Sequence, residues 1–237
     1  MIRRTTHRAS LSLGAAALVV AAAACANTAE SDFSSSEEPT AITLTAREGD
    51  VVVRANSASG TEVRWDESNA TPTATLEDGI LIVSDDCETG CSVDYTLLVG
   101  DAADVTIRLG SGNVSVSDVD GLITVDVDEG NVSLNTIAGG FDIDVARDGD
   151  ILGARLEGAS GSFVTAAGSI DVTFDTAVTD LVVRSGDGDV TAQLPGGPYA
   201  VDASASGSID ILVDEDAAAA ATVIISTDRG TATVYKK

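Results

Sequence analysis

The chain has 237 residues and a formal net charge of −25, from 38 acidic and 13 basic side chains. So acidic a chain repels phosphate groups, which argues against a nucleic-acid-binding protein. Hydrophobic residues make up 44% of the chain, which is enough for a globular core and excludes a disordered acidic tail. Aromatic residues make up only 3%, so we expect a core of valine, isoleucine, leucine and alanine, and the first two favour β-strands.

Residues 1–24 have the features of an export signal. Three arginines in the first ten residues precede an uncharged run, residues 11–24. This run is shorter than the about 20 residues of a transmembrane helix and matches the apolar region of a secretory signal. Small residues directly before Cys25 resemble the lipobox of bacterial lipoproteins, in which that cysteine is diacylated, although the pattern prefers leucine where this chain has Ala22. Ordinary signal cleavage after Ala24 is the alternative.

Removal of the signal would leave 10 basic and 38 acidic residues, a formal charge of −28. The only histidine, His7, would be lost with it, so the mature chain could form neither a Ser-His-Asp triad nor a histidine-ligated metal site. Residues 25–40 would then be the lipidated N-terminus and a polar, serine-rich, flexible tether.

From residue 41 onward the chain repeats a short pattern: a glycine, a small polar residue and an alternating apolar run. Examples are Gly112-Asn-Val-Ser-Val, Gly130-Asn-Val-Ser-Leu and Gly168-Ser-Ile-Asp-Val. From Gly112 the glycine spacings are 18, 19, 19, 20, 19 and 23 residues, and a second alternating run usually precedes each glycine. Each unit therefore predicts two half-buried strands joined at a bend, where glycine supplies a positive φ or lets the next unit approach closely.

This repeat predicts an all-β fold, a single-domain β-solenoid (β-helix) over residues 41–237 with coils of about 19 residues. A β-sandwich is the alternative, because it also has many short alternating strands. No segment carries a helical stripe, and the alanine-rich residues 214–221 predict a loop or one helical turn. The irregular residues 55–100, with Trp65 as a cap or core residue, are expected to help close one end of the stack.

Several of these features together resemble the bacterial putative-adhesin β-solenoid family, a domain of unknown function, in the form of an actinobacterial-type lipoprotein. They are the lipobox-like start, the repeated glycine units and the stretch Cys87-Glu-Thr-Gly-Cys91-Ser-Val-Asp-Tyr95. The resemblance covers residues 41–237. It implies an exported or membrane-associated bacterial protein with no established catalytic activity.

Cys87 and Cys91 enclose a tight turn. With Cys25 lipidated, the odd number of cysteines becomes one anchor and one pair, in a compartment that permits disulfides. We therefore expect a structural disulfide. A redox-active dithiol is the alternative, although such pairs usually have Cys-x-x-Cys spacing and lie in a βαβ context.

Many aspartates lie at outward positions beside the predicted bends. They are Asp118, Asp120, Asp126, Asp128, Asp148, Asp150, Asp187 and Asp189. Since they recur with the repeat, we expect a solvated, mutually repelling face that keeps the protein soluble. Calcium bound between stacked carboxylates is the alternative, but neither tandem calcium-binding nonapeptides nor an EF-hand loop occurs. The sequence thus predicts no metal and no cofactor.

The sequence as a whole predicts a non-catalytic lipoprotein, exported and anchored by Cys25 to the outer face of the bacterial cytoplasmic membrane. It would present a rigid acidic β-solenoid for adhesion, scaffolding or partner binding. The expected partners are the lipid bilayer and an unidentified envelope protein or glycan, with no nucleic acid. The alternative is a polysaccharide-cleaving β-helix enzyme that uses aspartate carboxylates. We expect no enzyme, because the aspartates follow the repeat instead of clustering in one coil.

Overall fold

The computed structural model describes residues 31–55 and 60–237, which form one all-β domain of two mixed sheets without a helix. In this part of the chain, no helix is long and apolar enough to cross a membrane. The predicted export signal, residues 1–24, and the predicted lipid-bearing Cys25 lie outside the described residues.

Sheet A has 11 strands in the spatial order β1-β4-β7-β3-β9-β11-β13-β15-β17-β21-β19. They are β1 (Ser31–Ser35), β3 (Val51–Ala55), β4 (Thr61–Ser68), β7 (Ser92–Val99), β9 (Val114–Val119), β11 (Val132–Ile137), β13 (Ile151–Leu156), β15 (Ile170–Phe174), β17 (Val190–Leu194), β19 (Ile209–Leu212) and β21 (Ala232–Lys236). The pairs β1–β4 and β4–β7 are antiparallel, and every other pair in sheet A is parallel.

Sheet B has 10 strands in the spatial order β18-β20-β16-β14-β12-β10-β8-β2-β6-β5. They are β2 (Ala41–Glu48), β5 (Thr73–Glu77), β6 (Ile80–Ser84), β8 (Asp104–Ser111), β10 (Ile123–Glu129), β12 (Phe141–Asp148), β14 (Ser160–Ala167), β16 (Asp180–Asp187), β18 (Ala200–Ala205) and β20 (Thr222–Arg229). Only β5 and β6 pair in the antiparallel direction.

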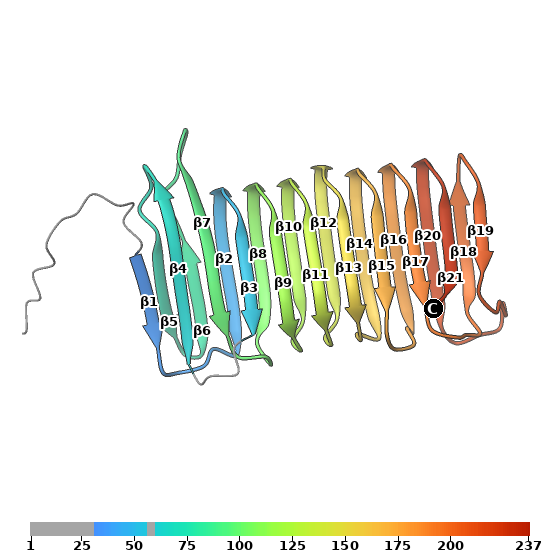
Figure 1. The fold of residues 1–237 in the computed structure, drawn as a ribbon, viewed down its shortest axis with the longest axis horizontal. Coiled ribbons are helices and arrows are strands. Elements are labelled where there is room, and N and C mark those ends of the chain that lie inside the picture. The colour runs from blue at the N-terminus through green and yellow to red at the C-terminus, as the bar shows by residue number, and fades with distance from the viewer. Residues whose placement is uncertain (1–30, 56–59) are drawn as a thin grey trace, which may run out of the picture.

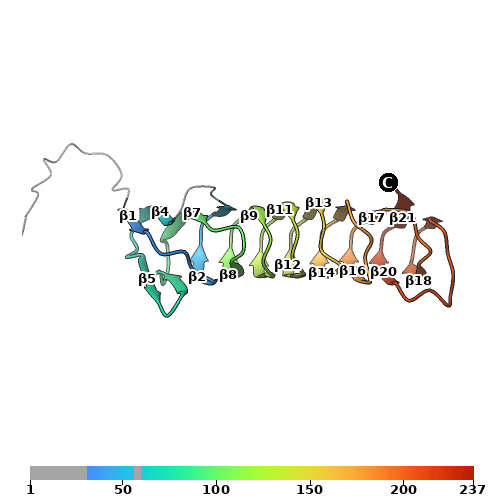
Figure 2. The same ribbon diagram turned by 90° about the horizontal axis from the view of Figure 1, so that it is seen from below.

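The two sheets form two layers along the long axis of the domain (Figures 1 and 2). From β8 to β17 the chain alternates between the layers, so each strand pairs with the strand two places later in the chain. Val125 of β10, for example, pairs with Ile107 on one side and Ile143 on the other. This confirms the predicted unit of two short strands joined at a glycine.

The core lies between the layers and consists of the alternate, inward side chains of each strand. Val125 and Ile143 are 1% and 0% exposed. The three buried phenylalanines gather in one place: the ring centroid of Phe163 lies 5.5 Å from that of Phe141 and 6.4 Å from that of Phe174. Three of the eight aromatic residues of the chain thus form one cluster within an aliphatic core.

The glycines at the bends stack in one column. Gly130 has a φ of +142°, and a Cβ on it would lie 1.9 Å from the carbonyl oxygen of Gly112 in the preceding unit. The same close approach, at 1.9 to 2.2 Å, recurs at Gly112, Gly149, Gly168, Gly188 and Gly230. The neighbouring carbonyl therefore requires glycine at all of these positions, and the backbone angle is a second reason at all of them except Gly149.

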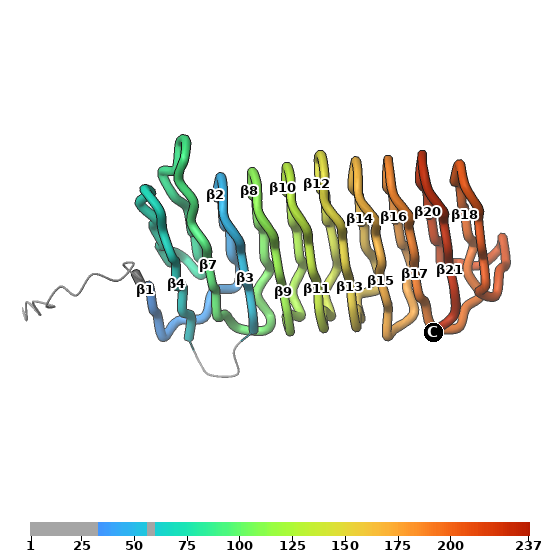
Figure 3. Tube along the Cα trace, turned by 45° about the horizontal axis from the view of Figure 1, so that its top comes forward, coloured from blue at the N-terminus to red at the C-terminus, as the bar shows by residue number. Residues whose placement is uncertain are grey.

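The order of the strands departs from the order of the chain at both ends of the domain (Figure 3). At one end β2 and β3 lie inside β6 and β7, and antiparallel strands from residues 61–84 close the sheets there, as expected for the irregular segment. Trp65 of β4 is 9% exposed and pairs with Tyr95 of β7. At the other end β20 and β21 insert between earlier strands, so β18 and β19 form the outermost pair.

The folded body begins before residue 41. Ser31–Ser35, in the segment expected to be a flexible tether, form β1 and pair with β4. Glu38 contributes further contacts, since its carboxylate accepts a hydrogen bond from the backbone N–H of Gly60 at 3.4 Å. The alanine-rich residues 214–221 form a loop, as predicted.

Candidate functional site

A ladder of side-chain oxygen atoms follows the glycine column. Asp50 Oδ1 accepts a hydrogen bond from the backbone N–H of Asn113 at 2.8 Å, and Asn113 Oδ1 accepts one from Asn131 at 3.2 Å. The ladder continues in the same way. Asn131 Oδ1 accepts a hydrogen bond from the backbone N–H of Asp150 at 2.9 Å, and Asp150 Oδ1 accepts one from that of Ser169 at 2.7 Å. The aspartate or asparagine after Gly49, Gly112, Gly130, Gly149 and Gly188 thus binds the backbone of the next unit. Its role is structural, because it supplies an acceptor to an N–H group at the bend.

The eight aspartates singled out from the sequence are all exposed, as predicted. The structure gives several of them a partner within the chain. Asp150 and Asp189 belong to the polar ladder, and Asp187 forms an ion pair with Arg229 at 2.8 Å. That pair is exposed and contributes little to stability. The aspartates therefore do not converge into one site.

Three carboxylates do gather on the outer face of sheet B. Asp126 of β10 lies in register with Asp144 of β12, and Asp142 lies two residues before Asp144. Burial, followed by the charges of Asp126 and Asp142, raises the pKa of Asp144 above its ordinary value. On its other side Asp144 pairs with Val164, which offers no positive charge. The sequence analysis missed Asp144, although Asp126 and Asp144 occupy the same place in successive units.

Replacing Asp144 with asparagine is expected to stabilise the protein at pH 7, by less than about 1 kcal/mol. The pKa of Asp144 is raised above 3.8 in the folded state, so ionisation costs stability as the pH rises through that folded pKa. Below the unfolded pKa of 3.8 the carboxyl is protonated in both states, so the gain should disappear there. Thermal melts at pH 3 and pH 7 measure the difference.

Asp171→Asn is the matched control for this variant. Asp171 lies on the outer face of sheet A, between Leu152 and Thr191 in the register, so no carboxylate pairs with it. An equal stabilisation by both substitutions would show that overall charge, and not the carboxylate cluster, is responsible.

The outer face of sheet A is close to neutral. On β9, β11, β13, β15, β17 and β21 the outward residues include two acidic side chains, Asp118 and Asp171, and two basic ones, Arg155 and Lys236. The other outward residues are uncharged: Ser115, Ser117, Ser133, Asn135, Thr136, Leu152, Ala154, Thr173, Thr191, Gln193, Thr233 and Tyr235. Sheet B has aspartates and arginines at many of its outward positions, so the two faces differ in charge.

A groove of about 490 Å³ lies on this nearly neutral face. Ser115, Ser133 and Asn135 line it with hydroxyl and amide groups, and Leu152 adds an aliphatic surface. Arg54 and Asp118 add one positive and one negative charge. Leu152 is 51% exposed. Such a lining can donate and accept hydrogen bonds to a neutral, polar, extended ligand, and it provides neither a nucleophile with a base nor a metal site.

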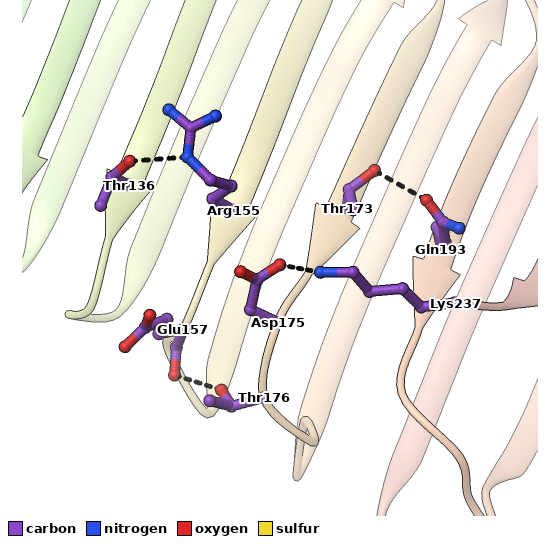
Figure 4. Close-up of polar contacts among 8 residues, drawn as sticks. All are labelled: Thr136, Arg155, Glu157, Thr173, Asp175, Thr176, Gln193 and Lys237. Carbon is purple, nitrogen blue, oxygen red and sulfur yellow. Dashed lines mark hydrogen bonds and ion pairs between the residues drawn. The ribbon is translucent and has the colours of Figure 1, made fainter.

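One end of the groove is shaped by a column of bulges. Asp118, Thr136 and Arg155 have φ values of 61°, 55° and 52° at equivalent places in β9, β11 and β13. Positive φ is rare for a β-branched residue such as Thr136. The bulge inserts an extra residue, so that the strand's last residue, such as Leu156, turns back into the core. Arg155 Nε donates a hydrogen bond to Thr136 Oγ1 at 3.0 Å (Figure 4).

Similar cross-strand contacts continue toward the C-terminus (Figure 4). Thr173 Oγ1 donates to Gln193 Oε1 at 3.4 Å, and the Lys237 ammonium pairs with Asp175. The first contact links the neighbouring strands β15 and β17, and the second joins the residues that follow β15 and β21, on either side of β17.

Cys87 and Cys91 form a disulfide with a Cα–Cα distance of 5.6 Å. The loop is held by Asp85, which accepts hydrogen bonds from the Cys87 N–H and the Tyr95 hydroxyl, both at 3.0 Å. Burial and the charge of Asp85 raise the pKa of Tyr95. A groove of about 570 Å³ lies beside the disulfide, and Arg47 and Asp85 are among the residues that line it.

In the described part of the chain, no group of three or more histidine, cysteine, aspartate or glutamate residues is arranged to hold a metal ion. The carboxylates of the polar ladder are separated by asparagines and serine, and they bind backbone N–H groups.

No protein-family model and no curated protein matches the chain. Among solved structures, a "putative lipid binding protein" from Parabacteroides distasonis is similar, with 14% identity, 88% of this chain and 96% of that chain covered, and a TM-score of 0.42. A "putative adhesin" from Bacteroides fragilis has 9% identity, coverage of 89% and 98%, and a TM-score of 0.39. A "putative cell adhesion protein" from Clostridium sporogenes has 11% identity, coverage of 88% and 100%, and a TM-score of 0.34. None of these similarities carries a residue role over to this chain.

Proposed function

We propose that this chain is a non-catalytic lipoprotein of the bacterial cell envelope that uses the outer face of sheet A for adhesion or partner binding. The observation that carries the proposal is the nearly neutral face itself, on a chain with a net charge of −25. Acidic surfaces repel the anionic polymers that surround bacteria, and a neutral face with hydroxyl and amide groups does not. An envelope protein or a neutral glycan fits this surface.

We propose that the fold that presents this face is a β-solenoid. Its support is the alternation of parallel strands between two layers and the single column of glycines, in which each unit contacts only its neighbours. A sandwich would not require one glycine per unit at the same bend. A rigid rod of this kind holds its outward side chains at fixed intervals, which favours binding to an extended partner.

The anchor in this proposal is a lipid on Cys25, which would hold the protein on the outer face of the cytoplasmic membrane. The sequence before Cys25 supports it, with an arginine-rich start and an apolar run of export-signal length. Each buried methylene contributes about 0.8 kcal/mol, and two acyl chains are enough for stable attachment.

The anchor is tested with Cys25→Ala in a bacterial host that attaches lipid to exported cysteines. The proposal expects the parent chain in the membrane fraction, labelled by a radioactive fatty acid, and the variant unlabelled and in the soluble fraction. Cys87→Ala, which leaves Cys25 in place, should still be labelled. A variant without Cys25 that stays with the membrane would refute the lipid anchor.

The binding face is tested by placing a charge on it. Ser133→Glu adds a carboxylate between Ser115 and Leu152 on sheet A, whereas Thr106→Glu adds one between Thr43 and Thr124 on sheet B. Binding of the full chain to isolated envelopes should fall at least fivefold for Ser133→Glu and change little for Thr106→Glu. Equal losses of binding by the two variants, with unchanged thermal stability, would refute the proposal that the outer face of sheet A is the binding face.

A polysaccharide-cleaving enzyme remains the second candidate, because Asp144 with its raised pKa lies beside Asp126, as an acid and a second carboxylate do in glycosidases. This candidate predicts that neutral or uronic-acid glycans are cleaved by the parent chain and not by Asp144→Asn. If the parent chain formed no products from a panel of such glycans, the glycan-cleaving candidate would be excluded in favour of the non-catalytic role.

A further inference from the structure

We propose that the C-terminal end of the two sheets, formed by β18 and β19, binds an extended segment of a partner polypeptide that alternates apolar and basic residues. The segment would add a strand to the free edge of β18. This surface is separate from the outer face of sheet A, and the proposal does not depend on the function proposed for that face.

The first support is the free edge of β18. Among the described residues, β18 pairs only with β20, and β19 only with β21. Tyr199, directly before β18, pairs with Glu215, so the free part of the edge begins at Val201. The backbone N–H of Ala200 donates to Ala221 O at 2.8 Å. Since successive N–H groups of a strand point to opposite sides, those of Val201, Ala203 and Ala205 face away from β20. An edge with such donors and acceptors is a template for another strand.

The second support is the apolar core that this end leaves open. Ala203 of β18 is in register with Ile225, which is 0% exposed, yet Ala203 itself is only half-buried. On sheet A, Ile209 is 44% exposed although its register partner Ala232 is 1% exposed. These inward positions lack the next layer of side chains that covers the same positions elsewhere in the domain.

The opposite end of the domain also has free edges, at β1 and β5. There the antiparallel β4 covers β7 and places Val63 and Trp65, 0% and 9% exposed, beside Leu97 and Tyr95. Leu76 of the edge strand β5 is half-buried, as Ala203 of β18 is. A partner strand added to β18 would therefore gain free energy by covering apolar surface, and the charge around β18 decides which partner fits.

The negative charge around β18 and β19 indicates which kind of partner segment would bind there. Residues 195–221 contain five acidic residues, Asp202, Asp210, Asp214, Glu215 and Asp216, and no lysine or arginine. Asp202 points outward from β18, next to the position of an added strand. A second copy of this chain would bring the same five acids against these. A basic strand is attracted, and its alternate apolar residues would cover Val201, Ala203 and Ala205.

The probe is a labelled ten-residue peptide of alternating valine and lysine, added to the detergent-solubilised full chain. Fluorescence anisotropy should show saturable binding that weakens as salt is raised, because charge contributes to it. Two control peptides alternate valine with glutamate, or glycine with lysine. The first should not bind, and the second should bind at least tenfold more weakly. Equal binding of the glycine–lysine peptide would overturn the proposal in favour of charge attraction alone.

A pair of substitutions at Ala203 tests the edge itself. Ala203→Pro removes an N–H that faces away from β20, so it should weaken peptide binding at least tenfold while the ladder to β20 is kept. Ala203→Val keeps that N–H and should bind at least as tightly as the parent chain. Thermal melts check that both variants fold.

Loss of peptide binding in both variants, or in neither, would overturn the assignment to β18. Sedimentation of the full chain over a range of concentrations adds a separate outcome. Self-association that Ala203→Pro abolishes would show that a second copy, and not a basic partner, occupies this end.

Discussion

Replacing Gly130 with alanine is expected to lower the free energy of unfolding by about 3–5 kcal/mol. The new Cβ would lie 1.9 Å from the carbonyl oxygen of Gly112, and the φ of +142° is unfavourable for any residue with a side chain. Neither unit can move away from the other without breaking parallel ladders in both sheets. Urea denaturation of the parent and variant chains, followed by far-ultraviolet circular dichroism, measures the loss.

Gly90→Ala separates the two causes. Gly90 also has a positive φ, +67°, but a Cβ on it would meet no atom within 4 Å. We expect this variant to lose only about 1–2 kcal/mol, from the backbone angle alone. If the two variants lost the same free energy, the close approach of neighbouring units would not limit the choice of residue at the bends.

Replacing Phe163 with alanine is expected to cost about 3–5 kcal/mol, because the ring is one of three mutually contacting aromatic rings in the core. Phe163 is 0% exposed, and its ring centroid lies 5.5 Å from that of Phe141 and 6.4 Å from that of Phe174. Gly161 makes room for this cluster, since a Cβ there would lie 2.9 Å from Phe141. The same denaturation experiment measures the effect.

Phe163→Leu is the control for the cavity, since leucine keeps much of the buried volume and should cost about 1 kcal/mol. A loss for Phe163→Ala no larger than that of Phe163→Leu would mean that the neighbouring aliphatic side chains collapse into the space. The aromatic cluster would then be dispensable for stability.

The regular part of the fold could be predicted from the sequence because each unit has the same short pattern of residues. Glycine at the bend and alternating apolar residues on either side are enough to predict two half-buried strands, and both are found around Gly112 and Gly130. The disulfide between Cys87 and Cys91 was also predictable, since exclusion of Cys25 leaves one pair. Each of these features involves only a short stretch of chain, and few alternative arrangements compete with it.

The order of the strands at the two ends could not be predicted. Strands such as β6 and β18 have the same alternation of apolar and polar residues whether they lie inside the sheet or at its edge. The exposure of two leucines could not be predicted either. Leu122 and Leu152 are 48% and 51% exposed, although both are apolar and stand next to alternating apolar residues that are buried. A shift of one residue exchanges the inward and outward sides of a strand, so the pattern alone does not show on which side such a leucine lies.

The nearly neutral face of sheet A has a signal in the sequence. Strands that follow a bend glycine, such as β9 and β11, carry serine between their apolar residues. Strands that precede one, such as β8 and β10, carry arginine or aspartate there. The difference in charge between the faces follows once the two kinds of strand are placed in separate layers.

The insertion of β20 and β21 has a consequence for the mechanical behaviour of the chain. Because β21 lies between β17 and β19, a force applied at Lys237 must shear a strand that is held on both sides (Figure 1). An edge strand would instead peel away from a single neighbour. The outermost pair, β18 and β19, is joined to the rest of the chain at both of its ends. The exposed end of the domain therefore has no loose terminus from which unravelling or exopeptidase digestion could start.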